Sequence, residues 1–242
     1  MEYIFNCSPR FLKSCLISNQ LHSKENFSMK IKWFGHSAFL LTSERGTRIL
    51  IDPYYRFIRY RMPSVEPDIV AVTHNHFDHN KIQAATGDYL LVNEPKEYIR
   101  EDVRIRGFKT FHDKVNGEKR GPNILYCFQM DDLTICHCGD LGHLLSEEQI
   151  NEIGKVDVLI IPVGGTVTIN ALEATQVMRQ LKSTITIPMH YRTKSLSVVG
   201  LMFSKVDKFL QISGKRTTEV KTLDISKENL PEYAGVVTMR YE

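Results

Sequence analysis

Residues 72–80 read VTHNHFDHN and place His74, His76, Asp78 and His79 directly after the apolar run DIVAV. The chain has nine histidines in all, so three within this stretch form a marked concentration. On an extended chain His74 and His76 project from the same face, and the next two residues follow as the chain turns. Imidazole and carboxylate groups suit zinc and similar divalent ions. The stretch therefore predicts part of a metal site, and the alternative is a polar turn that happens to be rich in histidine.

Further ligands are predicted where other apolar runs end. His112 follows one such run in TFHD, Asp140 follows another in CHCGD, and His190 follows a third in IPMH. Loops at strand ends collect functional groups on a rigid scaffold. Each residue alone has a structural alternative, such as a turn aspartate or a loop histidine. Together with the first stretch they make a set of seven, which favours a dinuclear site.

The hydrophobic pattern predicts strands separated by turns from Met29 onward. Residues 29–35, 38–43 and 47–53 predict a β-meander, and a hairpin is expected to turn at Asp131 and Asp132. Short strands are predicted over 103–108 and 109–113, and helices over 81–86, 94–102, 146–154 and 170–182. These elements indicate an α/β (α+β) fold of two packed sheets flanked by helices.

The organisation of the chain predicts one domain over residues 29–242. Residues 1–28 have weak periodicity and predict a poorly ordered or loosely docked leader, with a short docked helix over 9–18 as the alternative. The net charge of +3 is mild and its basic residues are interspersed with acidic ones, so no nucleic-acid partner is expected. No apolar run approaches the about 18–20 residues of a membrane span. Five cysteines without a repeating spacing favour a cytoplasmic location.

Several motifs, spread over about residues 29–240, resemble the metallo-β-lactamase superfamily: IKWFGHSAFLL, ILIDP, THNHFDHN, HDKVNGEKRGPN, HCGDLGH, VDVLIIPVGGTVTI and IPMHYRT. More narrowly, they resemble the branch that includes L-ascorbate-6-phosphate lactonases and N-acylphosphatidylethanolamine phospholipase D-like proteins. The resemblance implies a four-layer αβ/βα sandwich of two mixed sheets with the site at one edge. It also implies a metal-dependent hydrolase with two divalent ions, zinc first and manganese or iron as alternatives.

The resemblance implies a role for each ligand. The ligands form two triads that share one bridging carboxylate: His74, His76 and His112 for the first ion, Asp78, His79 and His190 for the second, and Asp140 for both. Asp52 matches an aspartate that braces the motif loop, the stretch over residues 72–80. The alternative role for Asp52 is a turn former before Pro53. Asp78 is also expected to orient the metal-bound hydroxide that attacks the substrate.

Other polar residues are candidates for the neighbourhood of the ligands. His137 and His36 are predicted to support the ligands, with a substrate contact open for His36, and His143 is predicted to donate a proton to the leaving group. Substrate contacts are predicted for Tyr191, Arg192 and Arg120, since a guanidinium suits a phosphate or carboxylate. The alternative for these loop charges is simple solvation.

The sequence thus predicts a hydrolase for a small lactone or ester, with or without a phosphate. One alternative is a phosphodiesterase or nuclease of the same superfamily, for which a basic patch or an added domain would be expected. The other is a non-enzymatic metal-binding protein, which would tolerate the loss of ligands. The sequence leaves the oligomeric state open, a homo-oligomer included.

Overall fold

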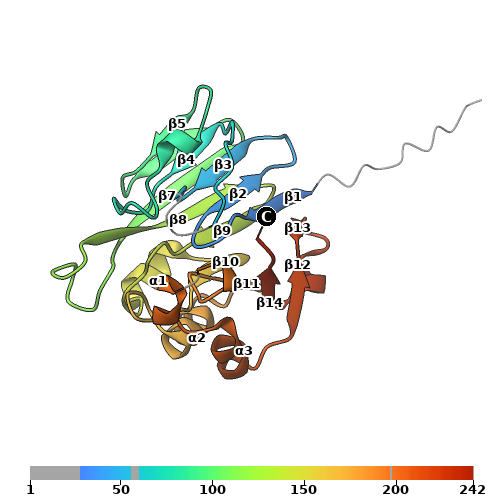
Figure 1. Cartoon of the computed structure of the whole chain (residues 1–242). Coiled ribbons are helices and arrows are strands. Elements are labelled where there is room, and N and C mark those ends of the chain that lie inside the picture. The colour runs from blue at the N-terminus through green and yellow to red at the C-terminus, as the bar shows by residue number, and fades with distance from the viewer. Residues whose placement is uncertain (1–27, 56–59, 197, 242) are drawn as a thin grey trace, which may run out of the picture.

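A computed structural model describes residues 28–55, 60–196 and 198–241. Within these residues the strands form two mixed sheets that pack against each other (Figure 1). The predicted leader falls almost wholly outside the described residues, so its order stays a prediction. In the described part of the chain no helix is long and apolar enough to cross a membrane.

The smaller sheet begins with the predicted meander. Its first three strands in the chain pair antiparallel, and two parallel strands follow. Phe39 and Leu41 enter the main core while Leu40 faces the opposite side, as the period of two requires. In order across the sheet, the strands are β13 (Thr222–Ile225), β1 (Met29–Trp33), β2 (Phe39–Thr42), β3 (Arg48–Ile51), β4 (Ile69–Ala71) and β5 (Leu90–Val92).

The larger sheet combines a parallel half with an antiparallel half. Its order is β12 (Thr217–Val220), β14 (Gly235–Met239), β11 (Ile185–Met189), β10 (Val158–Pro162), β9 (Leu133–His137), β8 (Pro122–Met130), β7 (Val103–Phe111) and β6 (Glu97–Arg100). The predicted hairpin of β8 and β9 is confirmed. Its turn residues Asp131 and Asp132 have φ of 51° and 56°, as a two-residue type I′ turn requires.

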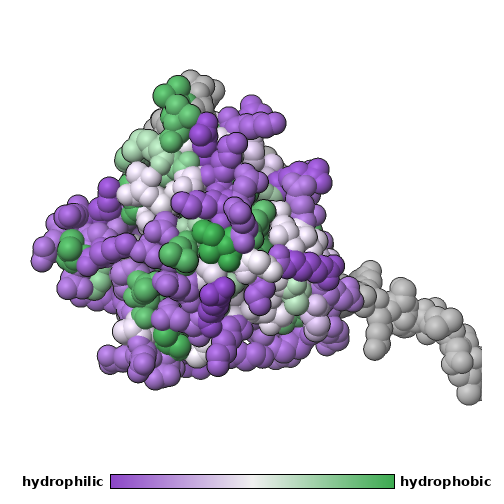
Figure 2. Space-filling model, turned by 90° about the horizontal axis from the view of Figure 1, so that it is seen from below, coloured by the Kyte–Doolittle hydropathy of each residue, from purple (hydrophilic) through white to green (hydrophobic). Residues whose placement is uncertain are grey.

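The α-helices α1 (Glu147–Ile153), α2 (Ala171–Leu181) and α3 (Val206–Ser213) lie together beside the larger sheet (Figure 1). Capping boxes begin α1 at Ser146 and α2 at Asn170, which confirms the helices predicted there. The surface on this side is mainly hydrophilic, with hydrophobic residues in small patches (Figure 2). The helices therefore bury their apolar faces toward the sheet.

The outer side of the smaller sheet is covered differently. A second apolar cluster there joins strand residues to loop residues: Phe34, Ala38, Leu40, Leu50, Tyr54, Tyr60, Val65 and Leu196. The described residues also form four short 3-10 helices, of which η3 contributes Leu196 to this cluster and η5 contributes Leu230 to the main core: η2 (Ile82–Ala84), η3 (Lys194–Leu196), η4 (Val199–Met202) and η5 (Leu230–Tyr233). The fold of two mixed sheets with flanking helices is confirmed, with the described α-helices on one outer side.

One predicted helix is wrong. Residues 94–102 contain the strand β6, which pairs antiparallel with β7 at the edge of the larger sheet. Tyr98 and Arg100 are partly buried while Glu97 and Ile99 are exposed, so burial alternates as in a strand. The two short strands predicted next are one continuous strand, β7, because it pairs along its length with β8.

A candidate metal centre

The predicted ligands gather at one edge of the sandwich, where strands of both sheets end. Because β9, β10 and β11 run parallel, the loops that follow them meet at the same edge. The four residues of the motif loop follow β4, and the others each follow a strand of the larger sheet: His112 after β7, Asp140 after β9 and His190 after β11. The site therefore depends on the alignment of both sheets.

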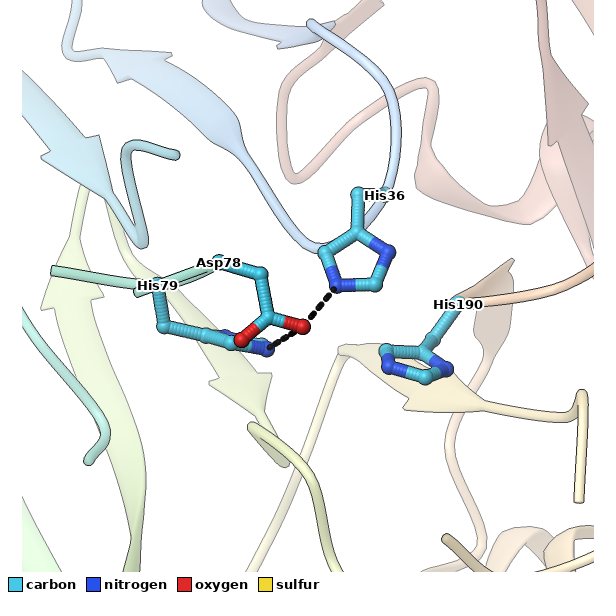
Figure 3. Close-up of side chains that lie close together, drawn as sticks. All are labelled: His36, Asp78, His79 and His190. Atoms are coloured by element: carbon cyan, nitrogen blue, oxygen red, sulfur yellow. Dashed lines mark hydrogen bonds and ion pairs between the residues drawn. The ribbon is translucent and has the colours of Figure 1, made fainter. Parts of the chain in front are cut away.

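The side chains form overlapping groups whose nitrogen or oxygen ligand atoms lie within 4.8 Å of one another. These groups are His74, His76 and His112; His36, Asp78, His79 and His190; and His74, His79 and Asp140. The second group is shown in Figure 3, where Asp78 lies between His36 and His79 with His190 facing them. All seven predicted ligands are brought together, and His36 joins them.

Asp140 occupies the centre of the arrangement. Its Oδ2 lies 3.0 Å from His112 Nε2, 3.2 Å from His190 Nε2 and 3.4 Å from His79 Nε2. The carboxylate is 2% exposed, so water contributes little to its solvation. One oxygen atom thus contacts a member of each predicted triad.

Asp52 fixes the start of the motif loop through hydrogen bonds to its buried carboxylate. Its carboxylate accepts hydrogen bonds from the Thr73 backbone N–H and hydroxyl, each 2.8 Å long, and from His79 Nδ1 at 2.9 Å. The last of these bonds directs His79 Nε2 toward Asp140. Sequence reasoning placed Asp52 near this loop but missed Thr73, because a threonine before a histidine carries no distinctive signal.

A buried network that the sequence did not reveal positions Asp140. Asn123, at the start of β8, accepts a hydrogen bond from the Asp140 N–H at 2.9 Å, and its amide donates to the Cys138 carbonyl at 2.9 Å. His137 donates through Nε2 to the Ser37 carbonyl at 3.0 Å and accepts at Nδ1 from the Gly139 N–H. His137 therefore ties β9 to the turn that carries His36, which is a supporting position.

Two glycines allow the backbone to approach the ligands closely. A Cβ at Gly142 would overlap the backbone between His112 and Asp113, and a Cβ at Gly164 would overlap the His190 carbonyl oxygen. Both contacts are with backbone atoms, which cannot move aside as a flexible side chain can. Glycine at these positions is thus part of how the ligands are placed.

The charges of the site are strongly coupled. Burial opposes ionisation of Asp140, but the imidazoles of His190 and His79 hold the pKa of that carboxyl well below its usual range. Burial also opposes protonation of His79, yet the carboxylates of Asp140 and Asp52 raise its pKa well above the ordinary value. For His74 burial prevails and lowers the pKa to about 3. In the protein without metal, a proton bound to His79 therefore offsets part of the negative charge of the buried carboxylates.

Unpaired atoms test whether the residues fit a cation. Among the described residues, the buried atoms His74 Nε2 and Asp140 Oδ1 have no hydrogen-bond partner. A buried polar atom without a partner is costly, and such atoms call for an ion or a water molecule. Imidazole nitrogens and carboxylate oxygens that face one another are the donor set for divalent metals. The residues fit a metal centre.

Three predicted residues are placed where the structure gives their roles no support. His143 accepts the Phe111 N–H at Nε2 (3.1 Å) and donates from Nδ1 to the Leu144 carbonyl (2.7 Å), so both ring nitrogens are used. Tyr191 is buried, with its ring 5.5 Å from that of Trp33. Arg192 lines a separate cavity of about 480 Å³ that contains no predicted ligand.

Arg120 lies on the loop that follows His112, and this loop has a defined shape. The Asp113 carboxylate accepts backbone N–H groups of Val115, Gly117, Lys119 and Arg120 at 2.8–2.9 Å. These bonds lower the pKa of Asp113 to about 2 even though burial opposes the change. A fixed loop thus presents the exposed Arg120 side chain next to the chain segment of a predicted ligand.

Comparison with known proteins gives consistent results. Residues 30–190 match the family model described as a β-lactamase superfamily domain. The chain is 31% identical over 198 residues to a UPF0173 protein of Pyrococcus furiosus, covering 69% of this chain and 85% of that protein. It is 29% identical over 191 residues to a UPF0173 metal-dependent hydrolase of Thermoplasma volcanium, covering 68% and 84% respectively.

Solved structures extend the comparison. A crystal structure from Thermotoga maritima, named as a proposed Zn-dependent hydrolase of the metallo-β-lactamase superfamily, matches with a TM-score of 0.74 and 36% identity. The match covers 88% of this chain and all of that one. Igni18, a metallo hydrolase of Ignicoccus hospitalis, matches with a TM-score of 0.62 at 20% identity, which shows the shared fold alone. These names specify no substrate.

Proposed function

The chain belongs to the metallo-β-lactamase superfamily of metal-dependent hydrolases, in the UPF0173 family, and from this premise we propose that it hydrolyses a small lactone or ester at a dinuclear metal centre. The observation that carries the proposal is the position of Asp140, one oxygen of which contacts His112 at 3.0 Å and His190 at 3.2 Å. A carboxylate placed between two groups of imidazoles suits a bridge between two cations.

Each group of side chains would hold one ion. His74, His76 and His112 offer three nitrogens to the first, and Asp78, His79 and His190 offer mixed donors to the second. Zinc fits the imidazole-rich donor set, and manganese or iron are the alternatives. The three carboxylates Asp52, Asp78 and Asp140 supply three negative charges toward the four positive charges of two divalent cations.

Bound ions would supply Lewis acidity toward the scissile carbonyl and would lower the pKa of water at the site. The protein's own contribution is orientation. The Asp78 side chain is 22% exposed, whereas that of Asp140 is 2% exposed, so Asp78 faces the open side of the site. Its carboxylate can accept a hydrogen bond from the attacking water and direct the other lone pairs toward the substrate.

For the substrate, we propose that Arg120 binds an anionic group such as a phosphate. The Asp113 carboxylate fixes its loop, and an ion pair between Lys114 and Glu173 ties the loop to the start of α2. A guanidinium on a fixed loop loses less side-chain freedom on binding than one on an open chain. The lactonase resemblance supports this choice of substrate class.

A matched pair of variants tests the substrate proposal. With one ester in phosphorylated and unphosphorylated forms, Arg120→Ala should lower kcat/KM about tenfold or more for the phosphorylated form alone. Arg192→Ala is the control, because Arg192 lines the separate cavity. Loss of the phosphate preference in Arg192→Ala instead would support the substrate contact that the sequence predicts for Arg192.

The hydrolase itself is tested by Asp140→Ala. We expect this variant to lose the second ion and to lower kcat/KM by about a thousandfold, since it removes several kcal/mol of charge stabilisation. Metal content is measured by elemental analysis, and hydrolysis is measured with lactones, esters and bis-p-nitrophenyl phosphate. Turnover of the diester alone by the wild-type protein would favour a phosphodiesterase. Full metal occupancy of the wild-type protein without turnover of any of these compounds would favour a metal-binding protein.

A further inference from the structure

His36 is held in a strained position next to the predicted ligands. Its φ is +53°, in the left-handed region that non-glycine residues seldom adopt. The turn around it is fixed by bonds from Phe34 N–H to the Ala38 carbonyl (2.9 Å) and from Ala38 N–H to the Gly35 carbonyl (3.0 Å). Strain of this kind persists only where the surroundings enforce it, and it is concentrated at functional sites.

The backbone of His36 is anchored to the ligands themselves. Its carbonyl oxygen accepts the His190 N–H at 3.2 Å and the Trp33 indole N–H at 3.1 Å. His190 has a φ of +52°, so two residues in the left-handed region meet at this bond. The turn between β1 and β2 is therefore fixed against the end of β11.

The imidazole of His36 is surrounded by predicted ligands. Its Nε2 lies 3.3 Å from Asp78 Oδ2, and its ring centroid is 4.2 Å from that of His190 and 5.1 Å from that of His79 (Figure 3). The residue is 3% exposed, and its Nδ1 has no hydrogen-bond partner in the part of the chain that the structure describes. An apolar side chain would fill this space without burying two polar nitrogens, so packing alone does not explain a histidine here.

We propose that His36 is a further ligand of the metal ion assigned to Asp78, His79 and His190. The inference rests on the proposed dinuclear centre. The four ligand atoms lie within 4.8 Å of one another, and the 3.3 Å between His36 Nε2 and Asp78 Oδ2 fits two ligands of one ion. With Asp140 in addition, the ion would have five protein ligands, which suits six-coordinate manganese or iron better than tetrahedral zinc.

The alternative role is a hydrogen bond from His36 to Asp78 that only positions this carboxylate. Cobalt(II) distinguishes the two, because it shifts the ring N–H proton resonances of directly bound histidines far outside their normal range. The protein is titrated with Co²⁺ by calorimetry and observed by proton NMR. His36→Asn is the variant of choice, since asparagine tolerates the left-handed backbone.

The expected result is a second Co²⁺ bound at least about tenfold more weakly by His36→Asn, with the resonance of one imidazole N–H missing. The first ion, at His74, His76 and His112, should bind as in the wild type and so reports that the variant is folded. Ser37→Ala is the matched control in the same turn, because no described residue makes a hydrogen bond to the Ser37 hydroxyl and its loss should change neither ion.

Two results would overturn the inference and leave the proposed function intact. One is unchanged binding of the second ion by His36→Asn. The other is weaker binding of the second ion by His36→Asn with every shifted imidazole N–H resonance of the wild-type protein retained. That result would make His36 a positioning residue. Failure of the wild-type protein to bind a second ion would instead overturn the dinuclear proposal and the inference together.

Discussion

At the scale of single residues, the coupling of Asp140, Asp52 and His79 governs how the site responds to pH. The carboxylates raise the pKa of His79 above its ordinary value despite burial. In the folded protein without metal, this proton stabilises the native state at low pH, and the stabilisation is lost as pH rises through the raised pKa. Metal binding requires the same nitrogen to be deprotonated, so protons and cations compete for one atom.

Metal affinity should therefore rise with pH through the neutral range. Below the pKa of His79, each proton displaced changes the affinity about tenfold per pH unit. Calorimetry in two buffers with different ionisation enthalpies counts the protons released. His74 should contribute none, since burial lowers its pKa to about 3. Affinity that is constant between mildly acidic and neutral pH would contradict this competition.

Asp52→Asn should weaken metal binding although Asp52 is assigned to no ion. Its carboxylate accepts from Thr73 twice and from His79 once, and an amide oxygen cannot replace all three bonds. The expected loss is about 10–100-fold in affinity, measured by metal titration. Asp68→Asn is the control, because among the described residues the Asp68 carboxylate accepts the Arg48 N–H alone and lies just before β4. An equal effect of both variants would argue for a general loss of stability.

The residues that were predictable from the sequence are those with a local signal. His74, His76, Asp78 and His79 share one short stretch, and the three distant ligands each end an apolar run. The supporting residues Thr73 and Asn123 have no such signal, because their roles come from contacts between segments far apart in the chain. His143 had the expected neighbours in sequence, but its ring turns to the backbone.

At the scale of elements, helix starts were predictable and the edge strand was not. The capping boxes at Ser146 and Asn170 satisfy backbone groups locally, so the sequence alone identifies them. The charged segment at β6 has no local feature that excludes a helix, and pairing with β7 decides its structure. Charged residues on an edge strand also hinder pairing with other chains.

The cap of α2 gives a prediction at this scale. Asn170 accepts the N–H groups of Leu172 and Glu173, and Asn170→Ala should lower the free energy of unfolding by about 1 kcal/mol. Denaturant unfolding measures the change. Leu172→Ala is the control, since Leu172 is 55% exposed and its truncation should cost within about 0.5 kcal/mol. Equal losses would mean that the cap contributes nothing particular.

At the scale of the whole molecule, the two sheets share one core and one candidate site. The main apolar cluster includes Phe39 of β2, Phe128 of β8 and Val177 of α2. The ligands likewise come from loops of both sheets, with the motif loop on one and His112, Asp140 and His190 on the other. A cation at this edge would bind the folded arrangement and not the separated sheets.

We therefore expect one cooperative unfolding transition whose midpoint rises with metal. An ion at a hundredfold excess over its Kd stabilises the folded state by about 2.7 kcal/mol per site. Calorimetric scans with added zinc or manganese, and with a chelator, measure the shift. Two separate transitions would contradict the prediction of a single domain over 29–242.

The glycines at 142 and 164 have a consequence for how relatives of this chain are sorted. A single methyl group at either position would displace the backbone of a ligand without altering any ligand. A homologue can therefore retain every histidine and aspartate of the motif and still be unable to assemble the centre. A classification of family members as active or inactive by their metal ligands alone would misassign such a protein. Checking the residues at these two glycine positions would identify it.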